Sequence, residues 1–184
     1  IKLNSKNINT YLPLISDLKL SNKNNKLIGE IDSFLNLTFD KTFKLVDYKN
    51  TNKGKVKELL FVFNKPIENL FIDKQISNLY FKDTVFDAKY SFDNKNELNV
   101  SGNYSIDDKN YQKFNVKNIF EKNSLDMVLS LDTNQKIKID VINFEKEINK
   151  DAKINLDLNF NKKNSIINIK QLDYLENKNA IIIK

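Results

Sequence analysis

The sequence contains no cysteine, histidine or tryptophan, and lysine supplies every one of its 30 basic residues. These absences exclude a catalytic triad or dyad built on histidine or cysteine, a zinc site of the usual nitrogen and sulfur ligands, and a disulfide. Only three glycines and two prolines occur, so the chain has no glycine-rich loop that could cradle a phosphate group. The sequence therefore predicts no catalytic residues, no cofactor and no metal site, and we do not expect an enzyme.

The charge is positive but dispersed. Thirty lysines against 24 acidic residues give a formal net charge of +6, and the longest basic run is the pair Lys162-Lys163. Proteins that bind nucleic acid usually cluster their basic residues and use arginine for phosphates and base edges. We therefore expect a lysine-dotted, solvated exterior and no nucleic-acid partner. Asp93 and Glu97 suggest a calcium loop, but the spacing lacks the glycine and terminal glutamate of an EF-hand and favours a solvated turn.

Apolar and polar residues alternate with a period of two from about residue 80 onward. In the first run, the even positions from Tyr80 to Phe92 share one predicted face, and the odd positions, including Phe81 and Asp83, share the other. Such alternation is typical of antiparallel strands with one apolar and one wet face. The polar segments that separate the runs have the length of hairpin turns. They are Asp93-Asn94-Lys95-Asn96, Asp107-Asp108-Lys109-Asn110, Asp132-Thr133-Asn134-Gln135 and Asn161-Lys162-Lys163-Asn164.

The front third is less regular than the rest. Leu59, Phe61 and Phe63 alternate before Pro66 ends that run. Residues 8–20 and 67–78 fit either a short helix or an irregular crossing. The whole pattern predicts an all-β fold, an elongated and twisted antiparallel meander with at most one short helix, and a soft division into residues 1–66 and 67–184.

A meander with one apolar face must hide that face from water. It can close on itself, fold into a sandwich, or curl into an open trough that an apolar guest fills. Closed forms usually need glycines or bulges at their corners, and three glycines in 184 residues provide few. The scarcity favours a gently twisted, elongated sheet with an open groove.

The longest apolar runs, Leu59 to Phe63 and Ala180 to Ile183, are far shorter than the roughly 20 residues that span a bilayer as a helix. The sequence starts at Ile1 and ends at Lys184, directly after the apolar run Ile181-Ile182-Ile183, like a strand cut short. We therefore expect an internal segment of a longer repeat protein, whose targeting or membrane segments lie outside it.

The order of these segments resembles the large AsmA-like proteins of Gram-negative envelopes, in particular the YhdP branch. The resemblance covers nearly the whole sequence and consists of apolar alternation with spaced glycines. The residues that carry it are Leu12-Pro13-Leu14, Asp17-Leu18-Lys19-Leu20, Ile28-Gly29-Glu30-Ile31-Asp32, Leu37-Thr38-Phe39, Phe43-Lys44-Leu45-Val46-Asp47-Tyr48, Gly54-Lys55-Val56, Ser77-Asn78-Leu79-Tyr80-Phe81-Lys82-Asp83, Leu98-Asn99-Val100-Ser101-Gly102-Asn103-Tyr104, Leu129-Ser130-Leu131 to Ile139-Asp140, and Asn143-Phe144-Glu145-Lys146.

The resemblance implies a segment of an inner-membrane-anchored bridge that crosses the periplasm. Such a bridge carries phospholipid acyl chains along an apolar β-groove, and regions outside this segment contact the inner and outer membranes. The predicted groove residues are Tyr80, Phe86, Ala88, Tyr90, Phe92, Leu98, Val100, Ile106, Phe114, Val116, Leu125, Met127, Leu129, Leu131, Ile137, Ile139, Ile154, Leu156, Leu158 and Phe160.

The residues by themselves leave two other classes open. Each apolar residue in that set could belong to the packed core of a structural or adhesive β-domain with no lipid conduit. Glu145 and Glu147 could form a carboxylate pair for acid–base catalysis, but a surface strand end fits them better. The shape of the apolar face separates the first two classes, because a conduit needs a continuous open strip and an adhesive domain needs a closed two-sheet core.

Overall fold

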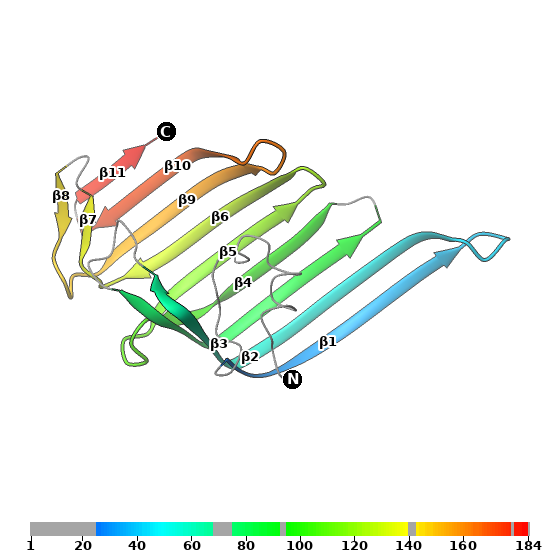
Figure 1. The fold of residues 1–184 in the computed structure, drawn as a ribbon, viewed down its shortest axis with the longest axis horizontal. Helices are drawn as coiled ribbons and strands as arrows, with labels where there is room; N and C mark the ends of the chain where they lie inside the picture. Colours follow the sequence, from blue (N-terminus) through cyan, green and yellow to red (C-terminus); the bar gives the residue numbers. More distant parts are fainter. Residues whose placement is uncertain (1–24, 68–74, 93–94, 140–142, 178, 184) are drawn as a thin grey trace.

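A computed structural model describes residues 25–67, 75–92, 95–139, 143–177 and 179–183. Within these ranges the chain forms strands and turns and contains no helix. The strands, coloured along the sequence in Figure 1, are β1 (Lys26–Phe39), β2 (Leu45–Ile67), β3 (Ile76–Ser91), β4 (Asn96–Ser105), β5 (Gln112–Phe120), β6 (Ser124–Thr133), β7 (Ile137–Ile139), β8 (Phe144–Lys146), β9 (Ala152–Asn161), β10 (Ile166–Glu176) and β11 (Asn179–Ile183).

Nine of these strands form one antiparallel sheet, in the order β1-β2-β3-β4-β5-β6-β9-β10-β11. Neighbours in the sheet follow chain order except for a short excursion, β7–β8, which forms a separate two-stranded sheet between β6 and β9. The end strands β1 and β11 do not pair with each other, so the sheet is open. This architecture confirms the predicted all-β antiparallel meander. The sheet also continues across the predicted division at residue 66, because β2 pairs with β3.

Two of the predicted turns lie where expected. Asp107–Asn110 connects β4 to β5, and Lys162 and Lys163 lie in the turn from β9 to β10. The segment Asp132–Gln135 does not form the expected hairpin, since β6 pairs with β9 and Ile137–Ile139 pairs with Phe144–Lys146 instead. Of the two segments that fit either a short helix or an irregular crossing, residues 8–20 lie outside the described residues, as do 68–74 of the segment 67–78. In that segment Ile67 ends β2 and residues 76–78 belong to β3, so its described residues form no helix. Residues 93–94 of the first turn also lie outside the described residues.

A bulge crosses β2 and β3 and reverses the alternation of their side chains. Lys57 is an extra residue of β2 relative to β1, because Glu58 pairs with Ile28 and Val56 with Gly29. The pairing of β3 with β4 shifts between Lys82 and Val85, and Asp83 between them has a φ of 49°. Extra residues of this kind bend a strand and shift which side chains share a face. Consequently Phe81, and not Tyr80, lies on the same face as Phe86.

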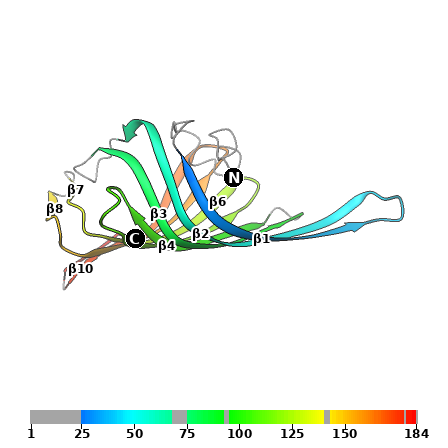
Figure 2. The same ribbon diagram turned by 90° about the horizontal axis from the view of Figure 1, so that it is seen from below.

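The sheet is bent, and its apolar face is the inner face of the bend. Viewed from below, one end of β2 and β3 rises from the flat part of the sheet together with the start of β1 (Figure 2). Phe61 and Phe63, in the rising part of β2, are each 8% exposed and pack with Leu79 and Phe81 of β3. Glu58 and Lys82, which alternate with this apolar set, lie on the opposite, outer face. A single layer thus separates an apolar inner face from a polar outer face.

Side chains fill the inner face closely around Gly102 of β4. A Cβ added at this position would lie 2.4 Å from Oγ1 and 2.7 Å from Cα of Thr84, closer than atoms pack. The φ of Gly102 is not positive, so close approach and not backbone conformation explains the glycine. Thr84 itself is 4% exposed, because it shares the inner face with Phe86 and lies beside this glycine.

We expect Gly102→Ala to lower the free energy of unfolding by about 1–3 kcal/mol, the usual cost of overpacking. Urea denaturation followed by circular dichroism measures this difference. Asn103→Ala, one residue along β4 on the outer face, is the matched control and should change stability far less. A Gly102→Ala variant as stable as the parent protein would contradict the close approach of Thr84.

Candidate functional site: the inner apolar face

The inner face carries a row of apolar side chains that are directly opposite one another in successive strands. From β3 to β10 the register aligns Phe86 with Val100, Val100 with Val116, Val116 with Leu129, Leu129 with Leu156 and Leu156 with Leu172. Residues directly opposite in a ladder lie on the same face. All six side chains are partly exposed, so the row is an accessible apolar surface. This row is the centre of the candidate site.

Two further rows flank the central row. Ala88, Leu98, Met127 and Leu158 align on one side, and Phe114, Leu131 and Ile154 on the other. Sixteen of the predicted groove residues belong to the inner face in this way. They are Phe86, Ala88, Tyr90, Phe92, Leu98, Val100, Phe114, Val116, Leu125, Met127, Leu129, Leu131, Ile154, Leu156, Leu158 and Phe160.

Four predicted groove residues lie elsewhere. Tyr80 is on the outer face because of the bulge at Asp83. Ile106 follows the last residue of β4 and belongs to the loop. Ile137, in β7, is 4% exposed and packs in a separate cluster with Ala152 and Tyr174. Ile139 ends the same short strand and pairs with Phe144, outside the large sheet.

Sequence reasoning missed part of the lining near the bend. The cluster around Phe61 and Phe63 includes Leu59, Leu79 and Phe81 from β2 and β3. The alternation of Leu59, Phe61 and Phe63 was a sufficient signal for the β2 part. Phe81 gave no such signal, because its odd position predicts the polar face. In the structure the bulge reverses the alternation and places Phe81 on the inner face. On β10, Leu172 joins Ile167 and Ile169 on the inner face through a similar shift between Ile169 and Gln171.

Aromatic rings connect the bent part of the face to its flat part. Ring centroids lie 6.0 Å apart for Phe61 and Phe81, 5.3 Å for Phe81 and Phe114, and 6.3 Å for Phe114 and Tyr104, all in edge-to-face geometry. Phe81 reaches Phe114 although β4 lies between their strands, since Gly102 has no side chain to separate them. Such contacts add about 0.5–1.5 kcal/mol each beyond area burial. They stiffen the lining at the bend.

Tyr104 has its ring in this apolar lining and its hydroxyl in a hydrogen bond. The hydroxyl donates to the backbone carbonyl of Asp132 at 2.9 Å. Burial raises the pKa of Tyr104 to about 12, since the apolar surroundings disfavour the phenolate. The hydroxyl therefore stays neutral at physiological pH, and no charge enters this part of the face.

Two asparagines interrupt the apolar lining. Asn118, 9% exposed, stands in the row between Leu98 and Met127, and Asn50 is opposite Tyr90. The amide oxygens of both residues are buried without a hydrogen-bond partner. A buried acceptor without a partner costs about 1–3 kcal/mol. The inner face is therefore apolar along its centre and locally polar at these two positions.

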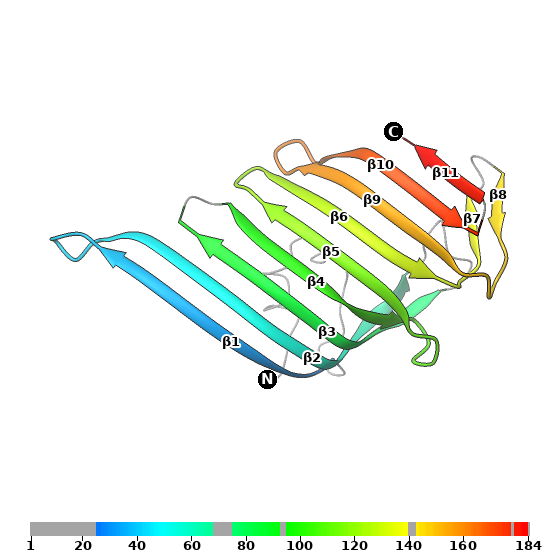
Figure 3. The ribbon, with the colours of Figure 1, turned by 180° about the vertical axis from the view of Figure 1, so that it is seen from behind.

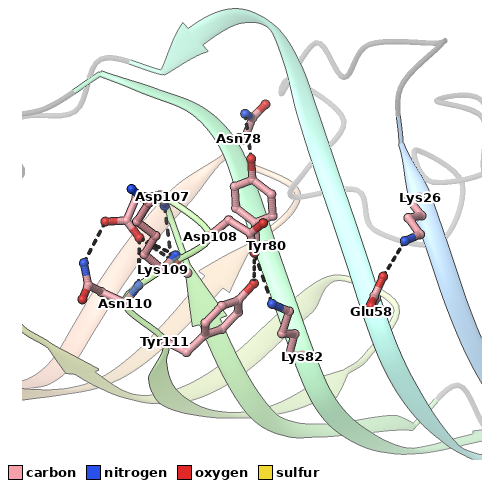
Figure 4. A network of polar contacts seen from close by, with 11 residues as sticks. Lys26, Glu58, Asn78, Tyr80, Lys82, Asp107, Asp108, Lys109, Asn110 and Tyr111 are labelled. Carbon is pink, nitrogen blue, oxygen red and sulfur yellow. Dashed lines mark hydrogen bonds and ion pairs between the residues drawn. The ribbon is translucent and has the colours of Figure 1, made fainter.

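The outer face carries paired charges. Figure 4 shows Lys82 with its ammonium 3.3 Å from Asp108 Oδ1 and 4.3 Å from the ring centre of Tyr111, whose hydroxyl donates to the same carboxylate. Lys26 pairs with Glu58 at 2.5 Å on the neighbouring strands. The hydrogen bond from Tyr111 and the nearby Lys82 lower the pKa of Asp108. These exposed pairs are worth little individually, and they keep the outer face soluble.

The loop between β4 and β5 is fixed by one carboxylate. Asp107 accepts hydrogen bonds from the backbone N–H groups of Lys109 and Asn110, both at 3.0 Å, and from the Ser105 hydroxyl at 2.8 Å (Figure 4). The backbone N–H of Asn110 is the main cause that lowers the pKa of Asp107. The arrangement is a turn that satisfies its own polar groups, and it presents no binding pocket of its own.

A buried polar cluster anchors β7 and β8 against the end of β10. The Lys146 ammonium, in a side chain 1% exposed, donates to the carbonyls of Gln135 at 2.8 Å and Glu147 at 3.0 Å. Desolvation lowers the pKa of Lys146 and raises the pKa of Tyr174, whose hydroxyl donates to Glu176 at 2.5 Å. These contacts join the excursion to the sheet and are structural.

Among the described residues, no three histidine, cysteine, aspartate or glutamate side chains come together in a way that could hold a metal ion. No helix in the described ranges is long and apolar enough to cross a membrane. Comparison with protein-family models, with curated proteins and with solved structures gave no match. The geometry of the inner face is therefore the basis for a proposed function.

The raised pKa of Tyr104 makes a prediction about alkaline stability. The pKa of Tyr104 in the folded protein lies above the value of about 10 for an unfolded chain. Its contribution to the free energy of unfolding is therefore present below pH 10 and is lost as the pH rises towards 12. Tyr104→Phe should lower the free energy of unfolding at neutral pH by about 0.5–1.5 kcal/mol, through the lost hydrogen bond. The variant should then lose less stability than the parent protein on going to high pH.

Urea denaturation across this pH range measures both effects. Tyr80→Phe, which removes a hydroxyl from the outer face, is the control. Equal alkaline losses of stability in the parent protein and the Tyr104→Phe variant would show that Tyr104 is not held neutral by its surroundings.

Proposed function

We propose that the inner face binds phospholipid acyl chains and that the protein carries lipid along this face. The observation that supports the proposal most is the central row from Phe86 to Leu172, which is apolar in every strand and partly exposed throughout. Among the described residues, the small sheet β7–β8 packs on Ala152, Ile154 and Tyr174 at one end of the inner face, in a cluster that includes no residue of the central row. An apolar surface of this extent on a soluble chain normally marks a binding site.

The dimensions suit an acyl chain. Strands in a sheet are spaced about 4.8 Å apart, so the row from β3 to β10 crosses roughly 24 Å. One leaflet of a bilayer has a hydrocarbon depth of about 15 Å, half of the 30 Å core. A chain that lies across the strands can therefore contact apolar residues along its whole length. It can also shift along the row, since each strand presents a similar side chain.

The energetics favour such a guest. Burying apolar surface is worth roughly 25 cal/mol per Å², and a methylene group taken out of water gains about 0.8 kcal/mol. The guest and the half-exposed side chains of the row would both lose contact with water. The polar interruptions at Asn50 and Asn118 lie beside the central row, so a chain along Val100 and Val116 avoids them.

The lipid headgroup remains outside the trough in this proposal. The inner face around the central row carries no charged side chain in the described strands from β4 to β6. Lysines dot the opposite face and the strand ends, where a phosphate could meet them as a point charge. Lipid transport between membranes, as part of a periplasmic bridge anchored in the inner membrane, is the cellular role that we propose for this binding.

Leu129→Lys tests the proposal by placing a charge in the centre of the row. A charge in hydrocarbon costs about 2.5 kcal/mol or more, so the variant should retain at least tenfold less co-purifying phospholipid than the parent protein. Mass spectrometry of solvent extracts from the purified protein measures the lipid content per chain.

Val128→Lys is the matched control, because Val128 is the preceding residue of the same strand and is 48% exposed on the outer face. It should leave the lipid content unchanged. Equal lipid content in Leu129→Lys and Val128→Lys would contradict binding at the inner face. A parent protein that is folded and free of lipid would support a structural or adhesive role instead.

A photocrosslinking residue at position 100 shows which face touches the lipid. Val100 is in the central row, whereas Ser101 follows it on the outer face. A crosslinker at Val100 should label phospholipid and one at Ser101 should not. Labelling from both positions would indicate non-specific contact with lipid.

A further inference from the structure

The hairpin formed by β1 and β2 extends beyond the rest of the sheet. The pairing of β2 with β3 ends at Lys49, opposite Ser91, and the Phe92 backbone N–H still donates to the Tyr48 carbonyl at 3.2 Å. Within the described part of the chain, residues 37–47 therefore have only two strands. We refer to residues 37–47 as the hairpin tip. Figures 1 and 3 show it as a narrow ribbon that projects past the turns at the same end of the other strands. A lone two-stranded ribbon is marginally stable in water, so contact with a partner would stabilise it.

Large apolar side chains are exposed along this tip. Phe43 at the apex is 88% exposed and Phe39 is 51% exposed. Leu37, Leu45 and Val46 are 44%, 38% and 42% exposed. Scattered apolar residues on a surface need no explanation, whereas a contiguous group marks a site of interaction.

The turn at the apex holds Phe43 outward in a fixed conformation. Asp40 accepts hydrogen bonds from the Thr42 backbone N–H at 2.8 Å, the Thr42 hydroxyl at 2.6 Å and the Lys44 backbone N–H at 3.0 Å. The Asp40 backbone N–H also donates to the Lys44 carbonyl at 2.9 Å. Phe43 has a φ of 59°, a conformation that side chains other than glycine adopt rarely. The backbone is therefore strained at Phe43, and the aromatic ring of this residue is exposed at the apex.

The charges next to this ring identify the kind of surface that it fits. Lys41 and Lys44 lie within two residues of Phe43 in the sequence, whereas the two carboxylates of the tip, Asp40 and Asp47, lie farther from it, and Asp40 faces the backbone N–H groups of the turn. An exposed aromatic ring between cationic side chains complements a surface that is apolar below and anionic above. The interface of a bilayer with acidic phospholipids has this composition.

We propose that the hairpin tip docks on the surface of an anionic lipid bilayer, with Phe43 inserted among the lipids and Lys41 and Lys44 at the phosphates. A protein partner fits less well, because a stable protein interface needs about 1,000 Å² and the tip is only two strands wide. A fluid interface can surround an apex, whereas a folded surface covers one side of it. This docking does not require the lipid-binding role of the inner face.

The inner side of the hairpin continues towards the central row but is not apolar throughout. Along β1, Leu37, Leu35 and Ile31 share one side of the strand, and Ile31 is opposite Gly54, which in turn is opposite Phe86 of the central row. Ser33 lies on the same side between Leu35 and Ile31, and its hydroxyl donates to Asn52 at 2.6 Å. The tip and the central row are therefore two separate apolar surfaces.

Phe43→Trp tests the docking directly, because the chain contains no other tryptophan. With vesicles of phosphatidylcholine and phosphatidylglycerol, we expect the emission of this tryptophan to shift to shorter wavelength and to be quenched by phospholipids with brominated acyl chains. Val128→Trp, exposed on the outer face of β6, is the control and should show neither change. Replacing Lys41 and Lys44 with glutamate should weaken vesicle binding at least about tenfold, since each basic residue near an anionic surface contributes roughly 1 kcal/mol.

Three results would overturn the proposal. One is an emission of the Phe43→Trp variant that vesicles neither shift nor quench. Another is vesicle binding that persists at full strength after Phe39→Ser and Phe43→Ser together. The third is a spectral shift that depends on protein concentration without vesicles, which would assign the tip to contact between copies of this chain. Leu129→Lys separates the two proposals, because it should remove co-purifying lipid and leave vesicle docking intact.

Discussion

A single antiparallel layer with strict alternation has a constraint that governs the whole molecule. Its backbone groups are satisfied by the ladder, but its large apolar side chains lie mainly on one face, and that face must be removed from water. Bending the sheet reduces the exposure and brings Phe61, Phe81 and Phe114 into contact. The flat part, along Val100, Val116 and Leu129, stays partly exposed. The same feature that weakens the isolated sheet makes its inner face suitable for an apolar guest.

Local irregularities decide how far the inner face extends. The bulge at Lys57 and Asp83 turns Phe81 inward, and the shift near Lys170 does the same for Leu172. Each bulge reverses a strand's alternation and therefore adds residues to the apolar lining that a regular strand would have placed outside. Gly102 complements the first bulge, because its missing side chain leaves room for Thr84 and for the contact between Phe81 and Phe114. The lining is continuous across the bend for these reasons.

The two proposed surfaces use different chemistry. The inner face around the central row carries no charged side chain in β4 to β6, and the Tyr104 hydroxyl there donates to a backbone carbonyl. The hairpin tip combines an aromatic apex with lysines, which suits the boundary between hydrocarbon and headgroups. Charged residues elsewhere pair on the outer face, as in Lys82 with Asp108 and Lys170 with Asp126. The distribution separates an apolar inner face from a charged surface exposed to water.

Alternation in the sequence by itself determined the strand content, the positions of the turns after β4 and β9, and most of the inner face, because period two follows from strand geometry alone. It could not place Tyr80 or Phe81, since the bulge between them and the rest of β3 is a property of pairing with β4. Nor could it exclude Ile137, whose run has the same alternation but pairs with β8, because partner choice depends on contacts distant in sequence. The sequence pattern likewise could not show that Phe43 projects from the sheet, because this depends on where β3 ends, at Ser91. Local pattern fixed which residues share a face of a strand, and tertiary pairing decided which faces join.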